Sequence, residues 1–155
     1  MELDLRRLRR GEQLAGVGAI LLFVFFFFFT WYGVGGDIGR LARAAGVDVS
    51  RNGWDGHSVL RWLVMLTIVS ALALVFLQAT QRTVALPVTL AVITTALAGL
   101  TTLLLAYRVV IDEPGPNAYT DVKLGAWLGL LSTALIFYAG YLSMRDEGAP
   151  PRAAS

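Results

Sequence analysis

The sequence predicts an all-α integral membrane protein: an antiparallel bundle of four transmembrane helices, with a short surface helix in its first outer loop. Its 155 residues are 56% hydrophobic and 15% charged, with a mean hydropathy of +0.64, unlike a soluble domain. Four segments reach the roughly 20 apolar residues that a helix needs to cross about 30 Å of hydrocarbon. Successive helical residues are about 100° apart, so the five rings of Phe25–Phe29 point to every side. Lipid can cover them all, whereas one protein core cannot.

The chain divides into a basic tail (residues 1–13), a membrane domain (residues 14–143) and a polar, disordered tail (residues 144–155). The predicted helices span residues 14–34, 59–77, 84–107 and 122–143. A first apolar run of this length exceeds that of a cleavable signal peptide, so we expect this helix to be retained. Arg6, Arg7, Arg9 and Arg10 precede it, which predicts cytoplasmic N and C termini in the plasma membrane.

The first outer loop, residues 35–58, is long for a compact bundle and is therefore the expected carrier of function. Asp37 can cap a short helix that ends at Gly46. The apolar face of this helix would contain Ile38, Leu41, Ala42 and Ala45. Such a helix is expected to lie on the bilayer surface. Asn52-Gly53 signals a turn, but the run beside it is too short to predict a hairpin.

Small side chains predict where the helices touch, because association in lipid depends on close backbone approach. The predicted contact residues are Ala91, Thr95, Gly99 and Thr102 on the third helix and Gly125 and Gly129 on the fourth. These two stripes are expected to face each other. The threonines could instead line a polar pathway, but a threonine hydroxyl can bond to its own helix, so packing is the favoured interpretation.

Composition excludes several classes of site. Cysteine is absent and His57 is the single histidine, which excludes disulfides, thiol chemistry and a His-rich metal or haem site. A net charge of +2 is too small to indicate a nucleic-acid partner. We expect no metal and no cofactor. No ionisable residue lies deep in the predicted spans, unlike in most proton-coupled carriers.

The polar and aromatic residues at the outer helix ends form the candidate ligand-binding site. They are Trp54, Asp55, His57, Arg61, Trp62, Arg108, Asp112, Asp121 and Trp127. A shallow pocket of these residues could hold a lipid head group or a small ligand. The favoured alternative is an ordinary aromatic belt with interfacial ion pairs. His57 could act as a base beside Asp55 or Ser58, but enzyme motifs are missing and no catalytic residue is predicted.

The layout, with a longer first outer loop than second, resembles that of tetraspan proteins such as the claudins, although the paired loop cysteines of that group are missing here. The segments NGWDGHSVLRWL, LPVTL and DVKLGAWLGLL resemble small four-helix membrane proteins of high-GC bacteria. This second resemblance spans most of the chain. It implies a bacterial membrane protein but no activity and no site residues.

Together these observations predict a non-enzymatic multi-pass membrane protein that acts as an accessory subunit, a scaffold or a self-assembling component. Its expected partners are membrane lipids and either further copies of the chain or another membrane protein. The alternative is a small oligomeric channel, or a carrier that binds a lipid or small ligand at the outer face. An enzyme ranks third.

Overall fold

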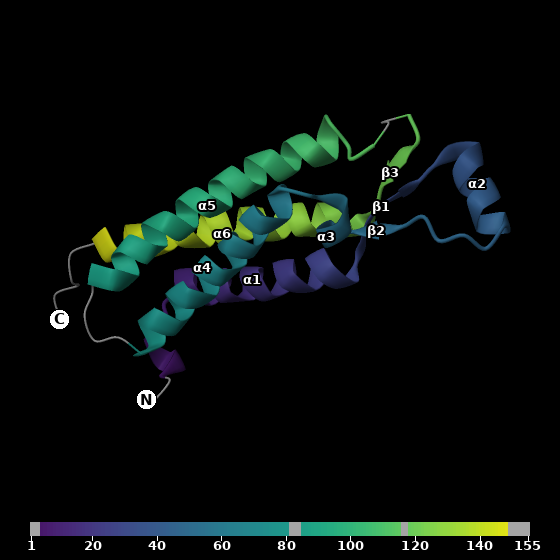
Figure 1. The fold of residues 1–155 in the computed structure, drawn as a ribbon. Coiled ribbons are helices and arrows are strands. Elements are labelled where there is room, and N and C mark those ends of the chain that lie inside the picture. Colours follow the sequence, from purple (N-terminus) through teal and green to yellow (C-terminus); the bar gives the residue numbers. More distant parts are fainter. Residues whose placement is uncertain (1–3, 81–84, 116–117, 149–155) are drawn as a thin grey trace.

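The computed structural model describes residues 4–80, 85–115 and 118–148, and the chain is mostly helical (Figure 1). Within these ranges, four helices are long and apolar enough to cross a membrane. They are α1 (Arg10–Phe28), α4 (Leu60–Thr80), α5 (Ala85–Val110) and α6 (Leu124–Gly148). Because 56% of the sequence is hydrophobic, each helix keeps apolar side chains exposed after its neighbours have packed against it.

The helix bounds differ from the prediction mainly at the two ends of the chain. The first helix begins at Arg10 and ends at Phe28 instead of spanning residues 14–34, and the tail before it contains the short 3₁₀ helix η1 (Leu5–Arg7). The last helix continues to Gly148, so residues 144–148 are helical rather than disordered. Residues 78–80 of the predicted second loop, residues 78–83, belong to α4 instead, whereas residues 81–83 and the rest of the last tail lie outside the described residues.

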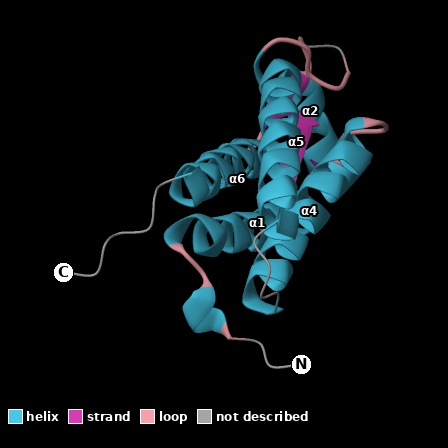
Figure 2. Cartoon of the chain, turned by 90° about the vertical axis from the view of Figure 1, so that its left-hand side faces the viewer, coloured by secondary structure: helices cyan, strands magenta, loops and turns pink. Residues whose placement is uncertain are grey.

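The long helices pack in a ring in which α1 contacts α4 and α6, while α5 contacts α4 and α6. The ends of α1 and α5 and the beginnings of α4 and α6 lie at the end of the molecule that holds the strands (Figure 1). Figure 2 views the molecule from the opposite end, with the strands behind the helices. The connection between α1 and α4 and the connection between α5 and α6 therefore lie together at this end of the helices (Figure 1).

Small residues bring α1 and α6 into close contact. A Cβ added to Gly11 would lie 2.7 Å from the backbone N of Ser143, and one added to Gly18 would lie 2.8 Å from Cγ1 of Ile136. Ala15 and Ala19 are fully buried on the same helix. Backbone approach of this kind holds helices together where apolar side chains alone have no preference for protein over lipid.

Short strands, which were not predicted from the sequence, lie at one end of the long helices (Figure 1). In the described part of the chain, three strands form a sheet of order β2-β1-β3 from β1 (Thr30–Val34), β2 (Arg51–Asn52) and β3 (Thr120–Val122). Both neighbours pair antiparallel with β1, with Tyr32 opposite Arg51 and Val122. Residues 30–34, predicted to be helical, are therefore the central strand. We call this sheet, with α2 (Gly36–Ala44) and α3 (Gly53–Gly56), the cap.

The predicted loop helix is present as α2, with different capping. Its N-cap residue is Gly35, while Asp37 lies inside the first turn and pairs with Arg40. Gly46 follows the helix with a φ of +71°, a conformation that glycine adopts without strain. The Asn52 side chain does not make a hairpin turn but accepts a hydrogen bond from the Asp55 N–H and so caps α3. In Figure 1, α2 projects from the sheet away from the long helices.

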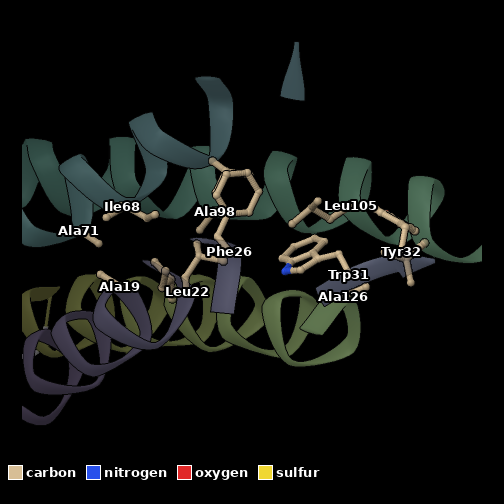
Figure 3. Packing of buried hydrophobic residues seen from close by; sticks show 13 residues of the cluster. Ala19, Leu22, Phe26, Trp31, Tyr32, Ile68, Ala71, Ala98, Leu105 and Ala126 are labelled. Carbon is tan, nitrogen blue, oxygen red and sulfur yellow. The ribbon is translucent and has the colours of Figure 1, made fainter. Parts of the chain in front are cut away.

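The core continues from the helices into the cap. Phe26 on α1 and Trp31 on β1 are fully buried and meet edge to face, with ring centroids 5.3 Å apart. Figure 3 shows these two rings between α5, which contributes Leu105, and α6, which contributes Ala126. Of the phenylalanine run, Phe26 is enclosed, whereas Phe28 is 75% exposed. The aromatic residues near the end of α1 thus fasten the cap to the helices.

Candidate functional site

Trp31 joins the cap to α6. Its ring lies over Gly125 and Gly129, where an added Cβ would overlap the indole. Its Nε1–H donates to the carbonyl oxygen of Phe25 at 2.7 Å, so the buried polar atom is satisfied. Gly125 and Gly129 therefore face Trp31, and the prediction that they face the third helix is wrong for these two residues.

The third-helix stripe does lie against α6 at two of its predicted positions. A Cβ on Gly140 would overlap Thr95, and a Cβ on Gly99 would lie 3.0 Å from the Phe137 ring. The hydroxyls of Thr95 and Thr102 donate to carbonyl oxygens of their own helix, each at 2.7 Å. Ala91, the remaining member of the stripe, is fully buried and supplies the carbonyl that Thr95 bonds.

His57 is buried between the cap and the beginning of α4. Its Nδ1 lies 2.9 Å from the carbonyl oxygen of Gly53, which can only accept, so Nδ1 carries the proton. Nε2 therefore accepts from the Tyr32 hydroxyl at 3.2 Å. Burial lowers the pKa of His57 below its usual value and raises that of the Tyr32 hydroxyl above its ordinary range. His57 is thus a neutral imidazole with both nitrogens engaged.

Three further members of the predicted cluster, Trp54, Arg61 and Trp62, contact one another. The guanidinium of Arg61 lies 4.9 Å from the ring centroid of Trp54 and 5.6 Å from that of Trp62. Trp54 in turn stacks on Phe27, with centroids 5.4 Å apart. Cation–π contacts of this type hold an arginine at an interface without a carboxylate partner.

The charged members are distributed over the same end of the molecule. Nη1 of Arg108, in the last turn of α5, lies 2.6 Å from Oδ2 of Asp112. Asp121, in β3, pairs with Lys123, which follows the strand. Asp55 is exposed on α3, and Trp127 is 46% exposed on α6. The structure therefore does not bring the nine predicted residues together in one site.

A groove between α4 and α5 brings two members of the cluster together. It has a volume of about 450 Å³. Its lining consists of His57, Ser58, Val59, Leu60, Leu63, Leu104, Tyr107 and Arg108. Only His57 and Arg108 were predicted as ligand-binding residues. The leucines were missed because a leucine facing a groove and one facing lipid look the same in sequence.

Two other hollows border β1. One of about 350 Å³ is lined by residues that include Arg43, Asp48 and Lys123, and another of about 450 Å³ lies on the side of Tyr119. Hydrogen bonds from the hydroxyl and N–H of Ser50 lower the pKa of Asp48. Among the described residues, no group of three His, Cys, Asp or Glu side chains is placed to hold a metal ion.

One ionisable residue of interest lies at the opposite end of the molecule. Glu12, expected in the cytoplasmic tail, is fully buried near the beginning of α1. Its Oε1 accepts from the Ser143 hydroxyl at 3.0 Å, and its Oε2 accepts from the Arg9 N–H at 2.5 Å. The burial of Glu12 was not predicted, because the helix begins at Arg10, four residues before the apolar run from which it was predicted. Glu12 links α1 to α6 with both carboxylate oxygens satisfied.

No protein-family model, curated protein sequence or solved structure matches the chain.

Proposed function

We propose that the protein is a non-enzymatic, multi-pass protein of the plasma membrane that acts through contacts of its cap with another membrane protein or a further copy of itself. The long helices would form an antiparallel bundle that crosses the bilayer four times, with both termini in the cytoplasm. The cap would then stand on the outer side. Its role would be that of an accessory subunit, a scaffold or a self-assembling component.

Membrane insertion is supported by the apolar surface that the helices leave uncovered. Between 33% and 44% of each apolar span is buried inside the molecule. Phe28, Leu103 and Leu131 are exposed by 75%, 71% and 66% on three different helices. Soluble proteins do not expose apolar surface on this scale, whereas lipid covers it at no cost.

The observation that carries the contact role is the surface of α2. Leu41 is 70% exposed and Ile38 is 52% exposed, and Val47 just beyond the helix is 53% exposed. Because α2 projects beyond the sheet (Figure 1), these side chains are displaced from the exposed apolar faces of the long helices. An apolar helix face held outside the membrane region is typical of a protein contact.

The geometry of His57 favours a structural role over a catalytic one. A general base needs a free lone pair near the proton it removes. Nε2 of His57 already accepts from Tyr32, and Nδ1 donates to Gly53. This histidine is therefore better suited to fixing α3 against β1 than to acid–base chemistry.

Native mass spectrometry from mild detergent tests the contact role. We expect a complex that contains a second protein chain, either a further copy or a partner, in fixed stoichiometry. Leu41→Asp should dissociate it, because a carboxylate cannot be buried unpaired in an apolar contact. Arg40→Asp places a carboxylate at an exposed position of α2 outside this apolar face and should leave the complex intact. A wild-type chain that is always alone would contradict the proposal.

A second candidate role, binding of a lipid or small ligand, is favoured by one observation. The groove between α4 and α5 combines an arginine with apolar side chains in about 450 Å³. That volume is within the range of ligand sites.

A further inference from the structure

The groove between α4 and α5 changes from apolar to charged along its length. Leu63 and Leu104 line it within the segments that are apolar enough to cross a membrane. Arg108 lines it one turn further along α5, in the last turn of that helix. The groove therefore combines hydrocarbon-facing side chains with a cation at the boundary where lipid head groups would lie.

The helices are joined next to the apolar part of the groove. The hydroxyls of Thr67 and Thr101 are 2.8 Å apart and buried. Thr67 lies one turn after Leu63 in α4, and Thr101 lies about one turn before Leu104 in α5. The groove lies on the cap side of this hydrogen bond, where its leucines are partly exposed.

Arg108 lines the groove, and an anionic side chain lies next to it. Arg108 lies beside Asp112, and its side chain remains 32% exposed and that of Asp112 51% exposed. A guanidinium has five N–H donors, and this ion pair engages Nη1. A purely anionic group that approaches Arg108 is repelled by Asp112. A group that carries both a phosphate and an ammonium complements both side chains.

We propose that this groove binds one zwitterionic membrane phospholipid. Its phosphate would accept hydrogen bonds from Arg108, and its ammonium would lie against Asp112. One acyl chain would pack along Leu63 and Leu104. The proposal names the ligand class for the second candidate role, and it rests on the proposed membrane insertion.

Lipid retention tests the proposal directly. The full chain is placed in nanodiscs of equal parts phosphatidylethanolamine and phosphatidylglycerol, released into mild detergent, and analysed by native mass spectrometry. We expect one phosphatidylethanolamine to remain bound. Arg108→Gln should reduce retention about tenfold, since it removes the charge-assisted hydrogen bonds to phosphate. Asp112→Asn should shift the preference toward phosphatidylglycerol.

Steric variants separate groove occupancy from charge. Leu104→Trp fills the groove and should also reduce retention, whereas Leu103→Trp adds the same bulk at a 71% exposed position and should not. Arg40→Gln removes another Arg–Asp pair, on α2, and is the matched charge control. Equal retention of both lipids by the wild type, or wild-type retention by Arg108→Gln, would overturn the proposal.

The two proposals fail in different ways. A chain that is extracted from membranes only with detergent and retains no lipid overturns the groove assignment and leaves membrane insertion standing. A chain recovered in the detergent-free soluble fraction overturns membrane insertion, and the lipid site with it.

Discussion

At the scale of single residues, the cap depends on a few buried polar and aromatic groups whose partners are far away in sequence. His57 bonds Tyr32, and Trp31 rests on two glycines of α6. The sequence shows that these residues lie near helix ends, but it cannot show which of them meet. Which residues meet depends on the change from helix to strand after Phe28. The apolar run continues through Thr-Trp-Tyr and does not reveal this change.

The single histidine should make stability depend on pH. Burial lowers the pKa of His57, so the unfolded chain binds a proton as pH falls through about 6.5, whereas in the folded chain this histidine binds a proton only at lower pH. Stability should be constant above this pH and decrease as pH falls below it, by at most about 1.4 kcal/mol per unit. Thermal unfolding in mild detergent at pH 7.5 and 5.5 measures the decrease. His57→Gln should abolish it, and an unchanged slope would assign the effect to another group.

The contact between Trp31 and the two glycines of α6 leaves no room for an added side-chain atom. Gly129→Ala places a methyl group inside the indole ring and should destabilise the protein by about 1–3 kcal/mol. Gly16→Ala is the control, because its Cβ would approach only the Val75 side chain, at 3.2 Å, which can turn. The two free energies of unfolding, measured by denaturant titration in detergent, should differ clearly. Similar values would contradict the close packing of Trp31 on Gly129.

At the scale of elements, the helix pairs are joined by different means. α1 and α6 approach through Gly11 and Gly18 and through the Glu12–Ser143 hydrogen bond. α4 and α5 are joined by the Thr67–Thr101 hydrogen bond. Gly11 and Gly18 therefore mark the face of α1 that contacts α6. The strands were not predictable, because two to five residues within apolar or turn-like segments give no period long enough to recognise.

The bond between the two threonines should be measurable as a coupling. Thr67 donates to the Leu63 carbonyl at 2.9 Å, so its oxygen accepts the proton of Thr101. A double-mutant cycle with Thr67→Val and Thr101→Val should give a coupling energy of about 0.6 kcal/mol, typical of such bonds between membrane helices.

Thr102→Val provides the control for this cycle. Its hydroxyl bonds the carbonyl of Ala98 in its own helix, so it should show no coupling to Thr67→Val. Equal coupling in both cycles would mean that packing, not the hydroxyl pair, joins α4 to α5. The free energies can be obtained from unfolding in denaturing detergent.

At the scale of the whole molecule, the sequence predicts the number and approximate position of the long helices, because about 20 consecutive apolar residues are a strong signal. It does not predict the cap, which follows from contacts between distant residues. Of the predicted ligand cluster, only His57 and Arg108 line one groove, since charge and aromaticity locate a helix end but not the direction of each side chain.

The absence of cysteine allows the topology to be tested with single-cysteine variants. Ala44→Cys on α2 should react with an impermeant maleimide in intact cells, and Leu5→Cys should react only after permeabilisation. Val69→Cys, 55% exposed in the middle of α4, should react in neither case, because lipid surrounds it. Labelling of Leu5→Cys and Ala44→Cys from the same side would contradict the proposed four crossings.

The packing of Trp31 on α6 also has a consequence for the order in which the chain folds during synthesis. The indole emerges from the ribosome about a hundred residues before Gly129, against which it comes to rest. Until α6 is made and in place, the two glycines that lie against this ring are missing. The cap can therefore be completed only after α6 has been made, and a nascent chain stalled before residue 124 would expose Trp31 to chaperones and proteases.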